Sequence, residues 1–310
     1  MKAKQFFSLI RWPNLVITVL SMVLIRQAII IPVLGVEGGM DITEFLSLIF
    51  SVVFVTIGGY LINDYFDMDA DRINKPGKNL VGTGFSVSLV KNLYYLFSAA
   101  GIILGLLVSW RVNEINYTLI FMFTVGILWY YSERYQCQII LGNAVVGILS
   151  ALSFGLVWIY DFFALKSEPE LFSTAQSNFG MVSKLVLIYM GFAFVTSLLR
   201  EMIKDIEDFK GDERTGCRTL PVAVGVTRAK HYAMVTGIIL LILVLRAHYF
   251  LFISGFTYAA AWFVLVDVLI LLIIYKLSKA DNTENFAHLS KLTKLLMLAG
   301  IFSMTMFWIR

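Results

Sequence analysis

The chain has 310 residues, of which 59% are hydrophobic and only 15% are charged. Soluble domains carry about 25% charged residues, and the mean hydropathy here is +0.80. These values exclude a water-soluble globule and a disordered chain. The net charge of +4 is too small to indicate nucleic-acid binding. At roughly 20 apolar residues per spanning helix, the length leaves room for about eight to ten transmembrane helices.

Apolar stretches of membrane-spanning length predict nine transmembrane helices and no separate soluble domain. The expected spans are, in chain order, Asn14–Val36, Phe45–Ile62, Val90–Val108, Tyr117–Tyr131, Ile139–Phe163, Leu185–Met202, Ala233–Ala247, Phe256–Tyr275 and Leu292–Trp308. The predicted fold class is therefore an all-α integral membrane protein. A single domain, residues 1–310, is expected to form a bundle around a central cavity.

The distribution of lysine and arginine predicts the orientation of these helices. With the N-terminus in the cytoplasm, 18 of the 25 basic residues fall in cytoplasmic segments and 5 in outer segments. Because short cytoplasmic loops are enriched in Lys and Arg, this bias supports nine spans with the N-terminus inside. We expect a protein of the cell (inner) membrane that contacts membrane lipids and binds no nucleic acid.

Cysteine and histidine offer little chemistry in this sequence. Cys137 and Cys217 are too few for a disulfide framework, and the chain has no C-x-x-C motif. The three histidines are far apart and lack metal-ligand spacing. The acidic residues are therefore the stronger candidates for a site.

Acidic residues are concentrated in two short windows, each following an apolar span toward the cytoplasm. Residues 63–71 and 201–213 together contain 10 of the 21 aspartates and glutamates. Within each window three aspartates recur at positions i, i+3 and i+7. They are Asp64, Asp67 and Asp71 in the first window and Asp205, Asp208 and Asp212 in the second. On an α-helix this spacing places each trio on one face.

Three carboxylates on one helix face repel one another unless a cation lies between them. Mg²⁺ prefers oxygen ligands and often binds through a few carboxylates plus substrate phosphates. Two such faces opposite each other are predicted to hold a diphosphate through Mg²⁺, whereas a solvated, self-neutralised loop is the plain alternative. Basic residues beside both windows are expected to bind the remaining phosphate oxygens. These residues are Arg72, Lys75, Arg200 and Lys204.

Both windows resemble motifs of the UbiA family of intramembrane aromatic and lipid prenyltransferases. The first window matches the family's NDxxDxxxD motif at Asn63, Asp64, Asp67 and Asp71. The second matches the other acidic motif at Asp205, Asp208 and Asp212, and a G-x-x-T-L-P tail follows over residues 216–221. Within the family, residues 70–76 and 200–212 are similar to the archaeal-type geranylgeranylglyceryl-phosphate geranylgeranyltransferases, also called digeranylgeranylglyceryl phosphate synthases.

The resemblance implies a Mg²⁺-dependent transferase of isoprenoid lipid biosynthesis whose active site faces the cytoplasm. A prenyl group, expected to be geranylgeranyl, would pass from an allylic diphosphate donor to a lipid acceptor, expected to be geranylgeranylglyceryl phosphate. The six aspartates would be catalytic as ligands of the metal, and Asn63 would join them as a seventh ligand.

Further substrate-binding candidates lie close to the two motifs. The family's Tyr-x-x-x-Lys pattern is matched at Tyr130 and Arg134, with Arg in place of Lys. Tyr60 lies one turn before Asp64 and offers a π face to a carbocation, although tyrosine is also common at membrane interfaces. Asn14 either contacts substrate or caps the first helix.

Arg26 and Asn143 are two of the polar residues that fall within the predicted spans. Arg26 needs a buried carboxylate partner or a polar cavity, and the sequence does not identify that partner. Asn143 is expected to face the interior of the bundle, either to contact substrate or to bond a neighbouring helix.

Two other functions remain open at this point. A quinone-pathway prenyltransferase acting on an aromatic acid such as 1,4-dihydroxy-2-naphthoate would use the same donor chemistry. A cation transporter is a more distant alternative, because transporter sites usually lie near the membrane midplane on broken helices, whereas these acids lie at helix ends.

Overall fold

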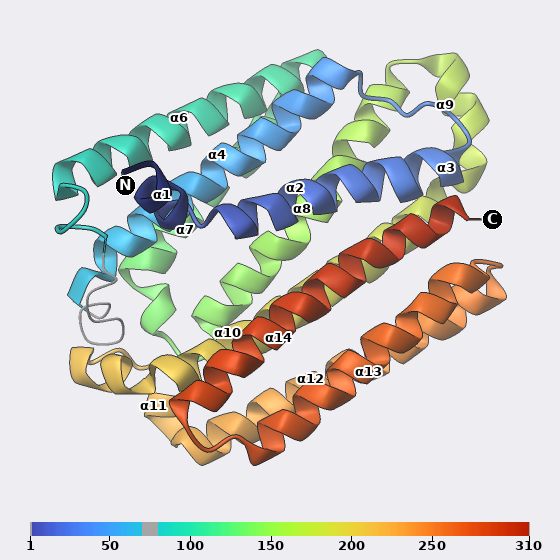
Figure 1. Ribbon diagram of the computed structural model, residues 1–310. Helices are drawn as coiled ribbons and strands as arrows, with labels where there is room; N and C mark the ends of the chain where they lie inside the picture. Colours follow the sequence, from blue (N-terminus) through green and yellow to red (C-terminus); the bar gives the residue numbers. More distant parts are fainter. Residues whose placement is uncertain (1, 70–79, 310) are drawn as a thin grey trace.

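The computed structural model describes residues 2–69 and 80–309, and these residues are almost entirely helical (Figure 1). Among them, nine helical stretches are long and apolar enough to cross a membrane, as predicted. They are Trp12–Leu34, Ile42–Phe66, Val87–Arg111, Ile115–Glu133, Leu141–Lys166, Pro169–Thr215, Val226–Ile253, Thr257–Lys279 and Thr283–Trp308. The described residues contain no β-strand, only one isolated bridge between Val81 and Phe85.

The individual helices follow this order along the chain. A short helix α1 (Lys2–Leu9) precedes α2 (Trp12–Leu24), a π-helical turn (Ile25–Ile30) and α3 (Ile31–Leu34). The remaining helices are α4 (Ile42–Phe66), α6 (Val87–Arg111), α7 (Thr118–Glu133), α8 (Leu141–Lys166), α9 (Pro169–Ala175), α10 (Phe179–Thr215), α11 (Leu220–Val224), α12 (Val226–Ile253), α13 (Thr257–Lys279) and α14 (Thr283–Phe302).

Helix α10 extends far beyond the span predicted from its apolar residues. It continues through the second acidic window because Met202, Ile203 and Ile206 maintain a buried face among the charged residues. It ends where Gly216 adopts a left-handed conformation with φ 76°. The second acid trio therefore lies on a regular helix, as the spacing predicts.

Helix α14 begins at Thr283, nine residues before the predicted start at Leu292. Its first turns are amphipathic: the side chain of Asn282 caps the helix, and Phe286 and Leu289 are buried. Because polar residues on the other face interrupt the apolar run, a prediction based on apolar runs misses these turns. As a consequence, Lys291, which precedes the predicted span, lies on the helix.

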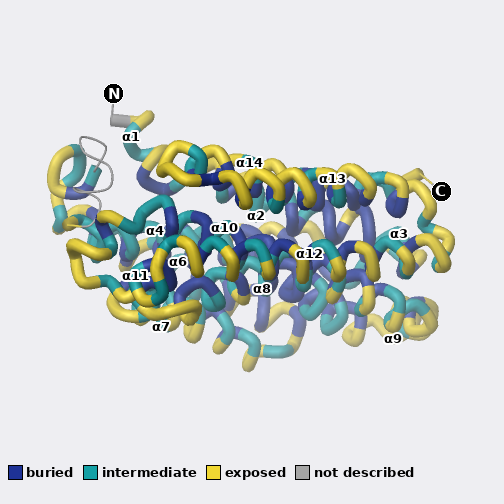
Figure 2. The backbone as a smooth tube through the Cα atoms, turned by 90° about the horizontal axis from the view of Figure 1, so that it is seen from below, coloured by how far each residue is buried: buried dark blue, intermediate teal, exposed yellow. Residues whose placement is uncertain are grey.

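The helices pack as neighbouring pairs that share a buried interior. Helix α4 packs on α6, α8 on α10, and α12 on α13, while α14 lies against α10, α13 and α2 (Figure 1). Exposed residues follow the outer surfaces of the bundle (Figure 2), and many are large and apolar, such as Phe123 and Leu187. Apolar surface of this extent is typical of contact with lipid.

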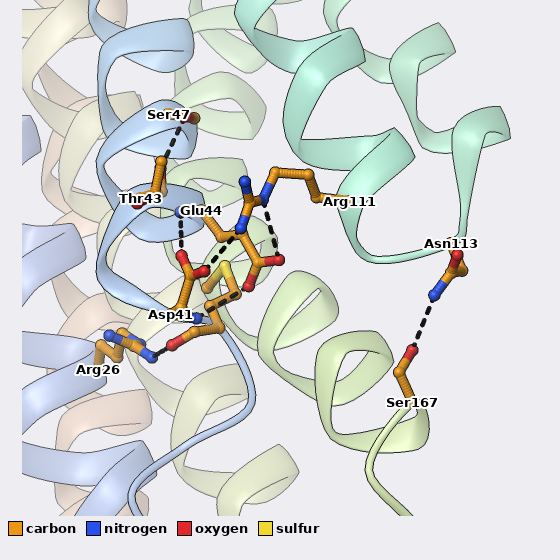
Figure 3. A network of polar contacts seen from close by, with 9 residues as sticks. Arg26, Asp41, Thr43, Glu44, Ser47, Arg111, Asn113 and Ser167 are labelled. Carbon is orange, nitrogen blue, oxygen red and sulfur yellow. Dashed lines mark hydrogen bonds and ion pairs between the residues drawn. The ribbon is translucent and has the colours of Figure 1, made fainter.

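Arg26 finds its partner on α8, which the sequence does not reveal. Its Nε donates to Asp161 Oδ2 at 3.0 Å, and both side chains are almost fully buried. Its Nη2 also donates to the carbonyl of Met40, a contact visible in Figure 3. The π-helical turn of residues 25–30 contains Arg26, and such turns are frequent at functional or otherwise special positions.

A more exposed polar network surrounds the start of α4 (Figure 3). Asp41 and Glu44 form a reciprocal capping box, and Arg111 donates to Asp41 Oδ2 at 2.8 Å. The pKa of Asp41 lies below its ordinary value, chiefly because the backbone N–H of Glu44 donates to its carboxylate. Together with Arg26, this network fixes the connection between α3 and α4 at the end of the bundle opposite the acid windows.

Candidate active site

The first acid set lies at the end of α4, where the helix stops earlier than the i, i+3, i+7 spacing implies. The helix ends at Phe66, and Asp67 occupies the C-cap position with φ −83° and ψ 4°. Asn63 and Asp64 therefore lie on the last turn, and Asp67 lies just beyond it. The predicted site residues Asp71, Arg72 and Lys75 lie outside the described residues.

Arg11 is the principal charged partner of this first set. Its Nη2 donates to Asp64 Oδ1 at 2.6 Å and to Asn63 Oδ1 at 3.0 Å. Its guanidinium carbon lies 4.9 Å from the ring centre of Tyr60, and the Tyr60 side chain is hydrogen-bonded to Asn14. Burial works to lower the pKa of Arg11, but the Asp64 carboxylate and other neighbours raise it overall, so the group remains charged.

Gln136 connects the other two described members of the first set. Its Oε1 accepts from Asn63 Nδ2 at 2.7 Å, and its Nε2 donates to Asp67 Oδ1 at 2.7 Å. Asn63 also donates to Asp67 Oδ2 at 2.9 Å. Gln136 comes from the 3₁₀ turn Tyr135–Cys137 that follows α7. The amide thus holds both motif side chains in one orientation.

A disulfide links this turn to the loop after α10. Cys137 and Cys217 are joined with their Cα atoms 4.6 Å apart, although 80 residues separate them in sequence. The backbone N–H of Arg218 also donates to the carbonyl of Cys137 at 3.1 Å. The sequence does not predict this pairing. The link connects the segments that carry Gln136 and the tail of the second acid motif.

The second acid set projects from the last three turns of α10. Asp205 Oδ2 accepts from Asn143 Nδ2 of α8 at 2.8 Å, and Asp212 Oδ2 accepts from the hydroxyl of Thr219 at 3.0 Å. The predicted inward orientation of Asn143 is confirmed, and it faces an acid of the motif. Asp208 lies between the other two and interacts electrostatically with Asp212.

The two acid sets are close enough to influence each other. The carboxylates of Asp67 and Asp212 interact electrostatically across the gap between α4 and α10. Tyr131 interacts electrostatically with Asp67 and also with Asp205, so it lies near both sets. Residues more than 130 positions apart in sequence thus form one acidic site at a single end of the bundle.

Two of the predicted basic residues flank a buried carboxylate on α10. Glu201 contacts Arg200 Nη1 on one side and Lys204 Nζ on the other, the latter at 3.6 Å from its Oε2. Glu201 also interacts electrostatically with Arg11, which connects this group to the first acid set. Arg200 and Lys204 are therefore brought to the site, as predicted.

The ligand chemistry of the site fits a hard divalent cation. Carboxylate and amide oxygens of both sets face a shared region, and these are the ligands that Mg²⁺ prefers. Within residues 2–69 and 80–309, however, no group of three His, Cys, Asp or Glu side chains is tight enough to hold a metal ion. In this structure Asp64, Asp205 and Asp212 are each hydrogen-bonded to a protein donor instead.

Tyr130 and Arg134 are not brought to the acid sets. Tyr130 is exposed and its ring lies 6.4 Å from that of Tyr135, while Arg134 is an exposed residue at the C-terminal end of α7. Among the described residues, no hydrogen bond or ion pair joins either side chain to an aspartate of the motifs. Their role in binding the diphosphate remains a prediction.

Several residues at the site are not identified by the sequence patterns. In sequence, Arg11 is only one of the cytoplasmic charges, Gln136 belongs to no motif, and Glu201 is only one acid within its window. Tyr131 is one of several aromatics near the end of α7. For Gln136, only its position along the chain indicates a role at the site. It follows α7 by three residues, at the membrane end where both acid windows are expected.

Substitution of Gln136 provides a test of its positioning role. Gln136→Ala is expected to lower turnover about 10- to 100-fold, because residues that orient metal ligands typically have effects of this size. The Mg²⁺ concentration for half-maximal activity should rise in the same variant. Gln138→Ala is the matched control, since Gln138 is exposed two residues further along. Equal activity of the two variants would show that Gln136 does not orient the motif.

Comparison with known proteins agrees with this site. The model of the UbiA prenyltransferase family matches residues 15–298, so the chain belongs to the UbiA prenyltransferase family. It is therefore an integral membrane prenyltransferase. The resemblance drawn from the two acidic motifs is confirmed.

Relatives over nearly the full length of the chain indicate its place within the family. The digeranylgeranylglyceryl phosphate synthase of Sulfurisphaera tokodaii is 26% identical over 309 residues, covering 96% of this chain and 98% of the relative. The protein of the same name from Methanosphaera stadtmanae is 30% identical and covers 82% of this chain and 84% of its own. The chain thus resembles the branch that its motifs suggest.

Solved structures confirm the fold. A digeranylgeranylglyceryl phosphate synthase superimposes with a TM-score of 0.63 at 23% identity, covering 98% of this chain and 99% of the other. A UbiA homologue from Archaeoglobus fulgidus bound to DMAPP and Mg²⁺ gives a TM-score of 0.58 at 16% identity, covering 97% and 99%. The nine-helix fold class is confirmed, whereas the orientation of the N-terminus and the central cavity remain predictions.

Proposed function

We propose that this prenyltransferase moves a geranylgeranyl group from geranylgeranyl diphosphate to a hydroxyl of geranylgeranylglyceryl phosphate. The observation that carries the proposal is the convergence of two acid sets and a group of basic residues at one end of the bundle. The names of the relatives from Sulfurisphaera tokodaii and Methanosphaera stadtmanae support this pair of substrates.

The proposed cofactor is Mg²⁺. Its proposed ligands are the oxygens of the two acidic motifs: Asn63, Asp64, Asp67, Asp71, Asp205, Asp208 and Asp212. The homologue from Archaeoglobus fulgidus, bound to DMAPP and Mg²⁺, supports a divalent metal. When bound, the metal would neutralise the negative charge that develops on the departing diphosphate.

The residues of the chain have distinct proposed tasks in the reaction. The allylic C–O bond of the donor breaks, the diphosphate leaves, and the acceptor hydroxyl oxygen forms the new bond to C1 and loses its proton. The aspartates hold the diphosphate end of the donor. The aromatic ring of Tyr60, already in contact with the cationic Arg11, is placed to face positive charge on the prenyl group.

Further residues are proposed to bind the two substrates. Arg200 and Lys204 would bind phosphate oxygens from α10, and Asn14 would orient Tyr60 or the acceptor. The other proposed contacts come from the motif tail and from the α7 end: Asn63, Arg72, Lys75, Tyr130 and Arg134.

The active site is proposed to face the cytoplasm of the cell membrane. The excess of Lys and Arg on the side of the acid windows supports this orientation. A membrane location suits the chemistry because donor, acceptor and product all carry long apolar chains that would enter the lipid. Membership of a prenyltransferase family argues against the transporter alternative.

A direct assay distinguishes the proposed acceptor from an aromatic one. Purified protein is given radiolabelled geranylgeranyl diphosphate with either geranylgeranylglyceryl phosphate or 1,4-dihydroxy-2-naphthoate, in Mg²⁺ or in EDTA. We expect Mg²⁺-dependent product from the glyceryl phosphate alone. Product from the naphthoate alone would assign the enzyme to quinone synthesis and overturn the proposal.

A further inference from the structure

Four basic side chains meet beside the two acid sets. Helix α14 packs against both α10 and α2, which brings Lys294 toward the site. Lys294 interacts electrostatically with three other cations and with Glu201. We call these four residues the basic cluster: Arg11, Arg200, Lys204 and Lys294.

Only two carboxylates of the described residues form direct ion pairs with the basic cluster. Asp64 pairs with Arg11, and Glu201 is shared between Arg200 and Lys204. Lys294 is half-buried and makes no hydrogen bond or ion pair within the described residues. Asp67, Asp205 and Asp212 also interact electrostatically with Arg11 or Lys204, but no carboxylate of the described residues pairs directly with Lys294, and like charges brought together away from water are costly unless an anion binds between them.

Arg200 adds a second sign of an anion site. Its side chain is 16% exposed, and its Nε is buried without a hydrogen-bond partner among the described residues. A buried donor left unpaired costs free energy, so groups of this kind normally face a ligand or water. Arg200 Nε and Lys294 Nζ are therefore two donors that make no hydrogen bond to a carboxylate of the described residues.

Arg200, Lys204 and Lys294 extend the basic cluster away from the aspartates, whereas Arg11 contacts the first acid set. On α10, Lys204 and Arg200 precede Asp208 by about 6 and 12 Å along the helix axis, at 1.5 Å per residue. On α14, Lys294 lies about three turns from the cytoplasmic start of the helix. The C1 atom of a donor held by the aspartates would lie next to the diphosphate, and its prenyl chain would extend toward this depth, so an acceptor phosphate held here would lie on the prenyl side of C1.

We propose that the basic cluster is a second anion site, which binds the phosphate monoester of the lipid acceptor. A phosphate monoester carries about −1.5 to −2 charges near pH 7 and has three acceptor oxygens. Its oxygens would accept from Lys294 and from the unpaired Arg200 Nε. This inference rests on the proposed function, since it requires a phosphorylated acceptor.

Lys294→Gln tests the inference through separate Michaelis constants for the two substrates. We expect the KM for geranylgeranylglyceryl phosphate to rise about 10- to 100-fold, as for loss of a charge-assisted hydrogen bond. The KM for geranylgeranyl diphosphate and the kcat at saturation should change less than about twofold. Lys294→Arg should restore most of the acceptor affinity, which a purely structural defect would not show.

The matched control is Lys291→Gln on the same helix. Lys291 is exposed one turn nearer the start of α14 and lines a surface groove between α13 and α14 instead. Its substitution should leave both Michaelis constants unchanged. Equilibrium binding without Mg²⁺ and donor adds a second readout: wild type should prefer geranylgeranylglyceryl phosphate to geranylgeranylglycerol, and Lys294→Gln should lose that preference.

The outcomes separate this inference from the proposed function. If wild type converts the glyceryl phosphate but Lys294→Gln leaves the acceptor KM unchanged, the second anion site is wrong and the function stands. If the donor KM rises instead, the cluster binds the diphosphate and the inference is overturned. If wild type does not use the glyceryl phosphate, both fail together.

Discussion

Replacement of Asp67 or Asp208 by alanine is expected to lower turnover by at least about 100-fold, while each protein remains folded in detergent. Asp67 follows the end of α4 and Asp208 lies on α10, and both interact electrostatically with Asp212. Loss of either one removes a proposed metal ligand, and single stabilising groups of this kind typically contribute about 100- to 1000-fold to kcat. Steady-state transfer of labelled geranylgeranyl measures the effect.

The control for this pair is Glu213→Gln. Glu213 lies next to Asp212 on α10 but is exposed, and it is not part of the i, i+3, i+7 trio. Its substitution removes the same charge from the same helix and should leave turnover within about twofold. Near-normal activity of Asp67→Ala and Asp208→Ala would refute the assignment of the metal site.

Asp161→Asn is expected to destabilise the fold more than any of the substitutions at the active site. The carboxylate accepts from Arg26 and from the backbone N–H groups of Gly39 and Met40, at 2.9 to 3.1 Å for its three best contacts. Removing one charge of a fully buried pair leaves the other unpaired, which costs about 3–5 kcal/mol. Thermal unfolding in detergent should show a transition roughly 5–10 °C lower.

A double variant separates the lost charge from the lost acceptor. In Arg26→Met/Asp161→Asn no charge of this pair remains, and the asparagine oxygen still accepts from the backbone, so we expect most of the stability to return. Asp41→Asn is the control, because its ion pair with Arg111 is half exposed and asparagine caps a helix equally well. An unchanged transition in Asp161→Asn would contradict the structural role of the pair.

The spans and the acid sets are predictable because their signals are local. A membrane helix requires a long apolar run, and a metal-binding face requires a fixed spacing along one helix. Asp205, Asp208 and Asp212 follow both rules on α10. The ends of helices are less predictable, because amphipathic turns such as the start of α14 at Thr283 carry polar residues that resemble a loop.

The contacts between distant segments are not predictable from one sequence. Arg26 clearly requires a buried acid, yet nothing in the local pattern of α8 selects Asp161. Arg11 and Gln136 reach the first motif only because α2 and α7 pack beside α4. Lys294 comes close to Arg200 because α14 lies on α10, a packing that the apolar runs do not predict.

The central claim is that both acid sets bind one metal–diphosphate unit, and metal binding tests it most directly. Mn²⁺ replaces Mg²⁺ in electron paramagnetic resonance titrations of wild type, Asp67→Asn and Asp208→Asn, each with and without geranylgeranyl thiodiphosphate. We expect tight Mn²⁺ binding only when the diphosphate analogue is present, and its loss in either variant. Binding that survives both substitutions, or that needs only one of the two sets, would contradict the account.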